Sequence, residues 1–234
     1  MKESCSLRNY FRDRLINDDQ GVRYPFVTIS RQEGAGAHTL ASELMRQMNQ
    51  RQNTEVFAGW NLFDVATYEG FANDPELQAT LDAVAKEEYH SEVTDLFLEV
   101  ISKLPQQYVV CKKLFTTMRK LAAMGKVILI GRAGCCVTRS VPGGIHLRLV
   151  APEALRVERV MKLQQLDKTA ATAWVHSHDR ERAHLLRDFF SRDIEDPLLY
   201  DAVWNTQSTS VVEIADITRR MIFKRVRDKI AQRM

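Results

Sequence analysis

Short apolar runs alternate with longer amphipathic stretches along most of this chain. Four runs dense in aliphatic residues predict strands, and they lie at 24–30, 126–131, 145–151 and 201–206. A weaker extended segment lies at 55–64. Because the predicted strands are separated by helices and short connections, the pattern predicts an α/β fold, with a parallel sheet of about five strands and helices on both faces.

The helices are predicted from apolar residues that recur along the chain at helical spacing. Leu40, Leu44 and Met48 mark the first helix, at four-residue spacing. Further helices are predicted at 75–104, 108–125, 152–166 and 212–230. Gly125 suits a helix C-terminal cap, and Pro152 with Glu153 suits a helix start.

We expect one domain over residues 22–234, preceded by a polar extension over residues 1–21. In open parallel sheets, ligands bind beside the carboxyl ends of the strands. The informative loops are therefore the four that follow Ile29, Ile130, Val150 and Trp204.

The composition narrows the class of function. The 33 basic and 30 acidic residues leave a net charge of only +3, which argues against a dedicated nucleic-acid binder. No run approaches the roughly 18 apolar residues of a membrane span, so no membrane contact is expected. Neither a disulfide framework nor a metal-ligand spacing is present among the cysteines and histidines, which predicts reduced thiols, a cytoplasmic location and no protein-built metal site.

The segment SRQEGAGAHT, residues 30–39, lies between the first predicted strand and the first helix. Gly34 and Gly36 allow the backbone to curl so that its amides point inward, and the helix start adds positive potential, which together make an anion cradle. Phosphate loops of this kind usually end in Gly-Lys-Ser/Thr, but Ala37 stands at the lysine position. A tight turn without a ligand is an equally good interpretation of the glycines alone.

Two arginine-containing segments follow. Arg132 leaves a buried strand between two glycines, where it either holds a substrate phosphate or forms a salt bridge at the end of the sheet. The segment 178–201 alternates arginines with acidic residues, which fits either a solvated helix or a lid that covers phosphates.

Taken together, the segments at 27–44, 127–139, 145–161 and 179–217 resemble the cytidylate-kinase-like family, a divergent branch of the P-loop nucleoside monophosphate kinases. The resemblance covers residues 24–222. It implies a three-layer P-loop kinase-like fold with a helical lid, the use of ATP and Mg²⁺, and transfer of the γ-phosphoryl group of ATP to a nucleoside monophosphate such as CMP or a related acceptor.

The resemblance also implies roles for individual residues. The phosphate-loop positions that bind the cofactor are Gly34, Ala35, Gly36, Ala37, His38 and Thr39, with Thr39 as an indirect magnesium partner. The catalytic arginines are Arg31, Arg132, Arg180 and Arg187, and the substrate-binding residues are Arg132, Asp179 and Arg182. The departures are Ala37 in place of lysine, which fits the divergent branch, and Ala133 where cytidylate kinases have aspartate.

Three hypotheses about function stay open at this point. The first is the monophosphate kinase, the second is a catalytically inactive nucleotide sensor or interaction module with the kinase fold, and the third is a kinase for a different acceptor. In each of them the partner is a nucleotide, and the formation of a homo-oligomer is undecided.

Overall fold

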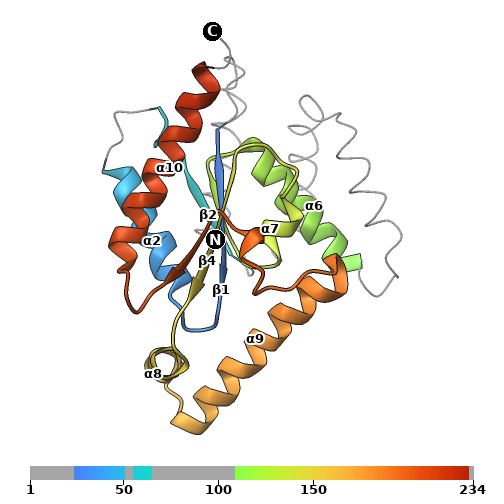
Figure 1. The fold of residues 1–234 in the computed structure, drawn as a ribbon, viewed down its shortest axis with the longest axis vertical. Helices are drawn as coiled ribbons and strands as arrows, with labels where there is room; N and C mark the ends of the chain where they lie inside the picture. Colours follow the sequence, from blue (N-terminus) through green and yellow to red (C-terminus); the bar gives the residue numbers. More distant parts are fainter. Residues whose placement is uncertain (1–23, 51–54, 65–108, 232–234) are drawn as a thin grey trace, which may run out of the picture.

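A computed structural model describes residues 24–50, 55–64 and 109–231 of the chain. Its centre is one five-stranded sheet in which every neighbouring pair is parallel, with the order β2-β3-β1-β4-β5 (Figure 1). The strands are β1 (Phe26–Arg31), β2 (Asn61–Phe63), β3 (Val127–Ile130), β4 (Gly144–Val150) and β5 (Ala202–Asn205). The predicted α/β fold with a five-stranded parallel sheet is confirmed.

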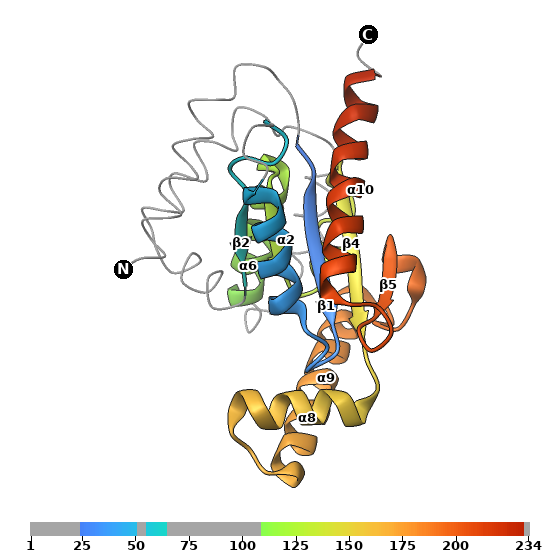
Figure 2. The ribbon, with the colours of Figure 1, turned by 90° about the vertical axis from the view of Figure 1, so that its left-hand side faces the viewer.

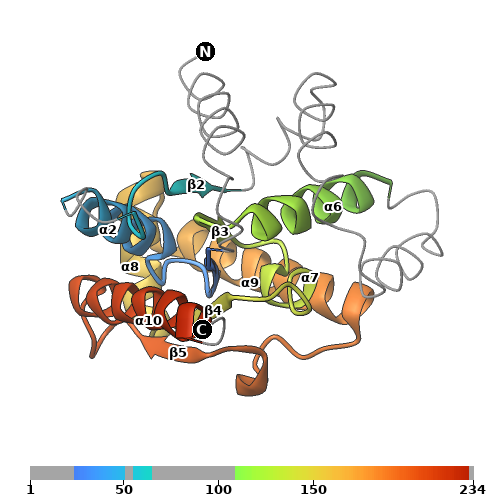
Figure 3. The same cartoon turned by 90° about the horizontal axis from the view of Figure 1, so that it is seen from above.

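Helices cover both faces of the sheet. The helices of the described ranges are α2 (Ala37–Asn49), α6 (Val109–Met124), α7 (Gly134–Val137), α8 (Glu153–Gln164), α9 (Lys168–Phe190) and α10 (Val211–Ala231). Seen from above, α2 and α10 lie on one face while α6 and α7 lie on the other (Figure 3). Each face has its own apolar core, one around Leu40, Leu44 and Ile214 and one around Phe115, Met118 and Leu121.

The observed elements follow the apolar pattern closely, with three differences. Of the extended segment 55–64, only Asn61–Phe63 is a strand. Pro152 lies at the N-cap of α8, one residue before the first helical position. The charged segment after residue 178 is the second half of one helix, α9. The predictions for residues 1–21 and 75–104 lie outside the described residues.

The strand register brings the carboxyl ends of the strands to one edge of the sheet. Ile29 of β1 is opposite Ile130 of β3, Ser30 is opposite Arg148 of β4, and Val150 of β4 is opposite Asn205 of β5. The helices α8 and α9 lie beyond this edge (Figure 2), joined by a small apolar cluster that includes Val157, Val160, Ala171 and Val175. The loops after β1, β3, β4 and β5 therefore meet under this helix pair, where a lid is expected.

Candidate functional site at the carboxyl edge of the sheet

The loop between β1 and α2 turns at its two glycines. Gly34 and Gly36 have φ angles of 76° and 92°, in the left-handed region that favours glycine. A Cβ on Gly34 would lie 2.6 Å from the backbone carbonyl oxygen of Arg156, so the loop runs directly against α8. Gly36 is the N-cap of α2, which places the end of the loop at a helix N-terminus.

Three consecutive carbonyl groups of this loop are bound from one side. Arg156 Nη1 donates to the carbonyl oxygen of Glu33 at 3.1 Å, Arg159 Nη1 to that of Gly34 at 3.2 Å, and the Thr206 hydroxyl to that of Ala35 at 3.0 Å. In a trans peptide the N–H of the next residue points opposite to the carbonyl. The amide of Gly34 therefore points away from α8 and that of Gly36 away from Thr206, which leaves both turned from the groups that bind the loop, as an anion cradle needs.

The two arginines of α8 are themselves fixed. Arg156 is buried and also donates to the Ala151 carbonyl oxygen at 3.0 Å and to the Asp179 carboxylate at 2.7 Å. Arg159 holds both the hydroxyl and the carbonyl oxygen of Thr206, at 3.0 and 3.2 Å. The loop is thus clamped to α8, α9 and the end of β5.

On the side of α9, Glu33 is paired through its backbone and its side chain. Its N–H donates to Asp179 Oδ1 at 2.7 Å, and its carboxylate forms an ion pair with Arg182. Burial opposes ionisation of Glu33, but the charge and hydrogen bond of Arg182, with smaller contributions from Arg31 and His178, hold the pKa of this carboxyl below its usual range. Glu33 is therefore an anion at neutral pH.

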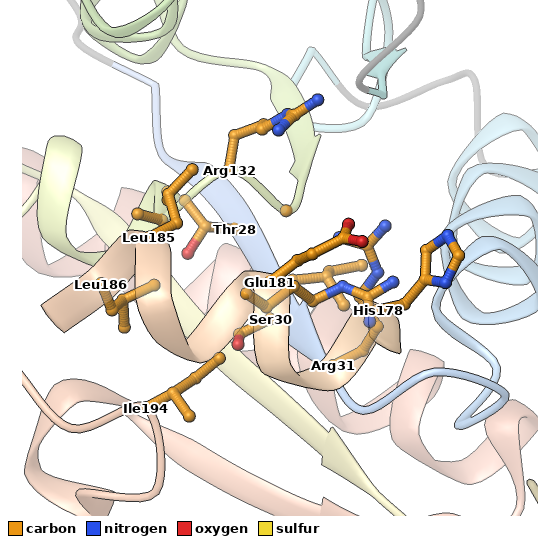
Figure 4. Close-up of a pocket in the computed structure, with 14 residues that line it drawn as sticks. Thr28, Ser30, Arg31, Arg132, His178, Glu181, Leu185, Leu186 and Ile194 are labelled. Atoms are coloured by element: carbon orange, nitrogen blue, oxygen red, sulfur yellow. The ribbon is translucent and has the colours of Figure 1, made fainter. Parts of the chain in front are cut away.

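A cavity of about 330 Å³ lies between the end of β1, the loop after β3 and helix α9. Figure 4 shows the side chains of Arg31, His178 and Glu181 together at one end, with Arg132 apart from them on the loop after β3. Leu185, Leu186 and Ile194 form an apolar part of the wall. The cavity therefore combines several charged groups with an apolar surface, as sites for small organic ligands usually do.

The loop after β3 has three successive residues with positive φ. They are Gly131 at 81°, Arg132 at 49° and Ala133 at 58°. A non-glycine residue in this region carries a steric cost of roughly 1–2 kcal/mol, so this turn is strained by its own backbone. A Cβ on Gly131 would overlap the guanidinium group of Arg31, so the absence of a side chain at Gly131 lets Arg31 approach the loop.

The structure brings some of the sequence-predicted residues together and separates others. Arg31, Arg132 and Arg182 all line the cavity. Asp179 lies beside them but faces the loop and Arg156. Arg180 and Arg187 are exposed and, at about 100° per helical residue, lie about 160° and 140° around α9 from Arg182. In this arrangement they face away from the cavity.

The phosphate-loop positions differ in exposure. Ala35 and Ala37 are buried in the core beneath α2, so the side chain at the lysine position faces the protein interior. His38 and Thr39 are exposed on the first turn of α2.

Several residues of the site were missed by reasoning from the sequence. They are Glu33, Arg148, Arg156, Arg159, His178, Glu181 and Thr206. Arg148 had a usable signal, because an arginine inside an apolar strand needs a partner. It is 2% exposed, donates to the Ser30 hydroxyl at 3.1 Å and pairs with Glu195. Arg156 and Arg159 gave no such signal in the sequence, since arginines on an amphipathic helix are usually solvated.

Two further observations concern only the described ranges. There, no group of three or more histidine, cysteine, aspartate or glutamate side chains is arranged to hold a metal ion. No helix of the same ranges has the length and apolar character needed to cross a membrane.

An open parallel sheet, a glycine loop at a helix N-terminus and an arginine-lined cavity at the carboxyl edge define an α/β protein with a candidate anion-binding site. The model of the cytidylate kinase-like family matches residues 26–208, and the chain belongs to this family. Membership places it among nucleotide-binding, kinase-like proteins.

Two solved structures and one curated protein are similar to the chain. An uncharacterized protein from Eubacterium ventriosum superposes with a TM-score of 0.66 at 19% identity, over 86% of this chain and 99% of the other, which supports the fold alone. TT1252 from Thermus thermophilus gives a TM-score of 0.45 at 16% identity, over 86% and 97% of the two chains, too distant to support a conclusion. A uronate isomerase from Corynebacterium glutamicum is 32% identical over 90 residues, which are 38% of this chain and 17% of that protein.

Proposed function

We propose that the protein binds ATP with Mg²⁺ at the loop after β1 and transfers the γ-phosphoryl group to a nucleoside monophosphate such as CMP. The observation that carries the proposal is the position of Arg31, Arg132 and Arg182 around one cavity, directly beside a clamped glycine loop. Phosphoryl transfer depends mainly on positioning and charge neutralisation, and both are available here.

The residues present fit a nucleotide phosphate. The amides of Gly34 and Gly36 point away from Arg156 and Thr206, and the N-terminus of the 13-residue helix α2 adds roughly half a positive elementary charge. Because Ala37 cannot supply the missing cation, the charge must come from another element. Arg182 and Arg31, which both act on Glu33 at the entrance of the loop, are the candidates.

Magnesium would be held here mainly by phosphate oxygens and water, with the exposed hydroxyl of Thr39 as an indirect partner. When bound, the ion would neutralise charge on the transferring phosphoryl group. The chain's own residues then orient the reactants: Arg132 would hold the acceptor phosphate at the far end of the cavity, while Arg182 would lie between acceptor and loop. The predicted reading of a pyrimidine nucleotide by Asp179 and Arg182 is part of the same proposal.

The test is product formation. The full chain is incubated with ATP, Mg²⁺ and each of CMP, UMP, dCMP, AMP and GMP, and nucleoside diphosphates are quantified by chromatography. We expect a diphosphate with at least one acceptor, and strong loss of product in Arg132→Ala. Arg220→Ala is the matched control, since Arg220 is 74% exposed on α10 and pairs only with Asp216 among the described residues. Absence of product with every acceptor would reject the kinase.

A nucleotide sensor without transfer is the second candidate. Two observations favour it: the buried Ala37 at the lysine position, and the engagement of Arg182 and the Glu33 amide by the chain's own carboxylates. A sensor would be stabilised by nucleotides in thermal-shift measurements and would form no product. We do not transfer the uronate isomerase activity, because the similarity covers 17% of that protein.

A further inference from the structure

The carboxylate of Glu33 lies where a ligand anion would have to bind. It is paired with Arg182, its charge is stabilised further by Arg31 and His178, and all three of these residues line the cavity. Glu33 is also the first residue of the glycine turn, immediately before Gly34. The group that neutralises the cationic end of the cavity therefore comes from the phosphate loop itself.

Two anion-binding groups at the entrance of the loop are already satisfied by acidic side chains. The backbone N–H of Glu33 donates to the Asp179 carboxylate, and the Arg182 guanidinium binds both Glu33 and Asp179. A guanidinium binds carboxylate and phosphate oxygens with the same planar fork. A carboxylate held in this way has the same chemistry as the phosphate oxygens that the site is proposed to bind.

The ion pair is only partly shielded from solvent, which makes exchange feasible. The side chains of Arg182 and Glu33 are 18% and 23% exposed. A phosphate that approached Arg182 without displacing Glu33 would place two anions side by side in a half-buried site, which is unfavourable. The two anions must therefore compete for the guanidinium.

We propose that Glu33 is an internal competitor of the substrate phosphate for Arg182, and that it restricts the site to ligands with enough negative charge to displace it. The proposal rests on the proposed function, because it concerns the same arginines. Its consequence is specific: the negative charge of Glu33 weakens the binding of phosphate-bearing ligands. A role in which Glu33 merely orients Arg182 for the substrate predicts the opposite sign.

The experiment compares the wild-type chain with Glu33→Gln, which keeps the shape of the side chain and removes its charge. Binding of inorganic pyrophosphate and of CMP is measured by titration calorimetry. We expect binding about tenfold tighter in Glu33→Gln, the scale of one charge-assisted hydrogen bond no longer in competition. Glu158→Gln is the matched control, because Glu158 is exposed on α8 and pairs with Lys162.

Two additional variants keep the result interpretable. Glu33→Ser replaces Glu33→Gln if the latter does not fold, as judged by its thermal melting curve. The double variant Glu33→Gln/Arg182→Ala tests the route of the effect, and there we expect a gain over Arg182→Ala that is clearly smaller than tenfold, because only the direct charge repulsion is relieved.

Each outcome decides the question. Unchanged or weaker pyrophosphate binding in Glu33→Gln, no detectable binding to either chain at millimolar pyrophosphate, or a gain that is equally large without Arg182 would overturn the proposal. The kinase proposal fails separately, if no diphosphate product forms. A tenfold gain in pyrophosphate affinity without any product would therefore support the competitor and reject the kinase.

Discussion

The two glycine-containing loops at the carboxyl edge of the sheet, after β1 and after β3, are stabilised in different ways. The loop after β1 is held by residues far away in sequence, Arg156, Arg159 and Thr206, which bind its carbonyl groups. The loop after β3 is shaped instead by three successive positive φ angles, and its Gly131 N–H donates to the Ile29 carbonyl oxygen of β1 at 3.1 Å. Gly134, at the end of this loop, packs closely on Thr28 of β1. A Cβ added to Gly134 would lie 3.2 Å from the Cβ of Thr28.

The comparison separates two tasks. Backbone amides can bind phosphate only if their orientation is fixed, so the first loop needs a rigid support from α8. The second loop carries a single arginine side chain into the cavity, and a strained turn is sufficient for that. We therefore expect changes behind the first loop to affect stability and nucleotide binding together, and changes in the second loop to act mainly on the cavity.

The largest effect is expected from Arg156→Met. The substitution removes a buried cation and leaves Asp179 Oδ2 and two carbonyl groups without this donor, so the free energy of unfolding should fall by about 3 kcal/mol. Nucleotide binding should be lost with it. Urea denaturation measures the first and calorimetry the second. The control Arg220→Ala should lower the free energy of unfolding by less than about 0.5 kcal/mol. Equal losses in Arg156→Met and Arg220→Ala would refute the clamp.

The next prediction compares alanine substitutions at one glycine of each loop, Gly34 and Gly131. Gly34→Ala places a methyl group against a backbone carbonyl at 2.6 Å in a left-handed residue, and should cost about 2–3 kcal/mol. Gly131→Ala has similar backbone strain but meets only the movable end of Arg31, and should cost about 1–2 kcal/mol. Thermal and urea unfolding of the two variants measure the difference. A larger loss of unfolding free energy in Gly131→Ala than in Gly34→Ala would contradict this account of the two loops.

A pH effect is expected beneath the second loop. Burial lowers the pKa of His146 to about 4, with Asp201 opposing and Arg139 and Arg225 assisting, and its Nδ1 lies 2.8 Å from the Thr28 hydroxyl. The unfolded chain binds this proton below about pH 6.5, so acid favours unfolding. The contribution of neutral His146 to the free energy of unfolding is therefore complete above pH 6.5 and declines toward pH 4, by about 2 kcal/mol between pH 7 and pH 5. Urea unfolding at both pH values should show this decline in the wild type and a smaller one in His146→Gln.

The last comparison concerns binding rather than stability, and it includes the smallest expected effects, those on the outer face of α9. Arg182→Ala should weaken binding of a pyrimidine monophosphate by about 1–3 kcal/mol, because it removes a charge-assisted contact. Arg180→Ala and Arg187→Ala should each change it by less than about 0.5 kcal/mol, since both side chains are exposed on the other face. Calorimetric titration with CMP ranks the three. Equal losses would mean that α9 presents its other face to the nucleotide.

The fold was predictable from the sequence because its signals are local. Apolar runs such as 127–130 and the spacing of Leu40, Leu44 and Met48 determine which segments are buried, and the helices between the strands indicate that the sheet is parallel. The loop after β1 and Arg132 were visible for the same reason, since glycines and a charge at the end of a buried strand are unusual in their surroundings.

The rest of the site depends on contacts between distant segments. Nothing in residues 152–166 indicates that Arg156 and Arg159 bind carbonyl groups more than a hundred residues earlier in the chain. The alternating charges of α9 likewise indicate a helix but not which arginines face the sheet, because opposite charges on neighbouring positions satisfy each other on any face. Glu33 lies in a loop that the sequence singles out, but its pairing with Arg182, 149 residues later, was not predictable from local pattern.

The most direct test of the central claim, that the clamped loop after β1 binds nucleotide phosphates, is a residue-resolved amide titration. Spectra of the ¹⁵N-labelled chain are recorded by NMR while ATP and Mg²⁺ are added. The account predicts the largest shifts at the amides of Gly34, Gly36 and the first turn of α2, with smaller shifts at Gly131–Gly134 and the inner face of α9. Shifts confined to the opposite edge of the sheet, such as Ser140–Gly144, or unchanged amides at Gly34 and Gly36 at saturating ATP, would contradict it.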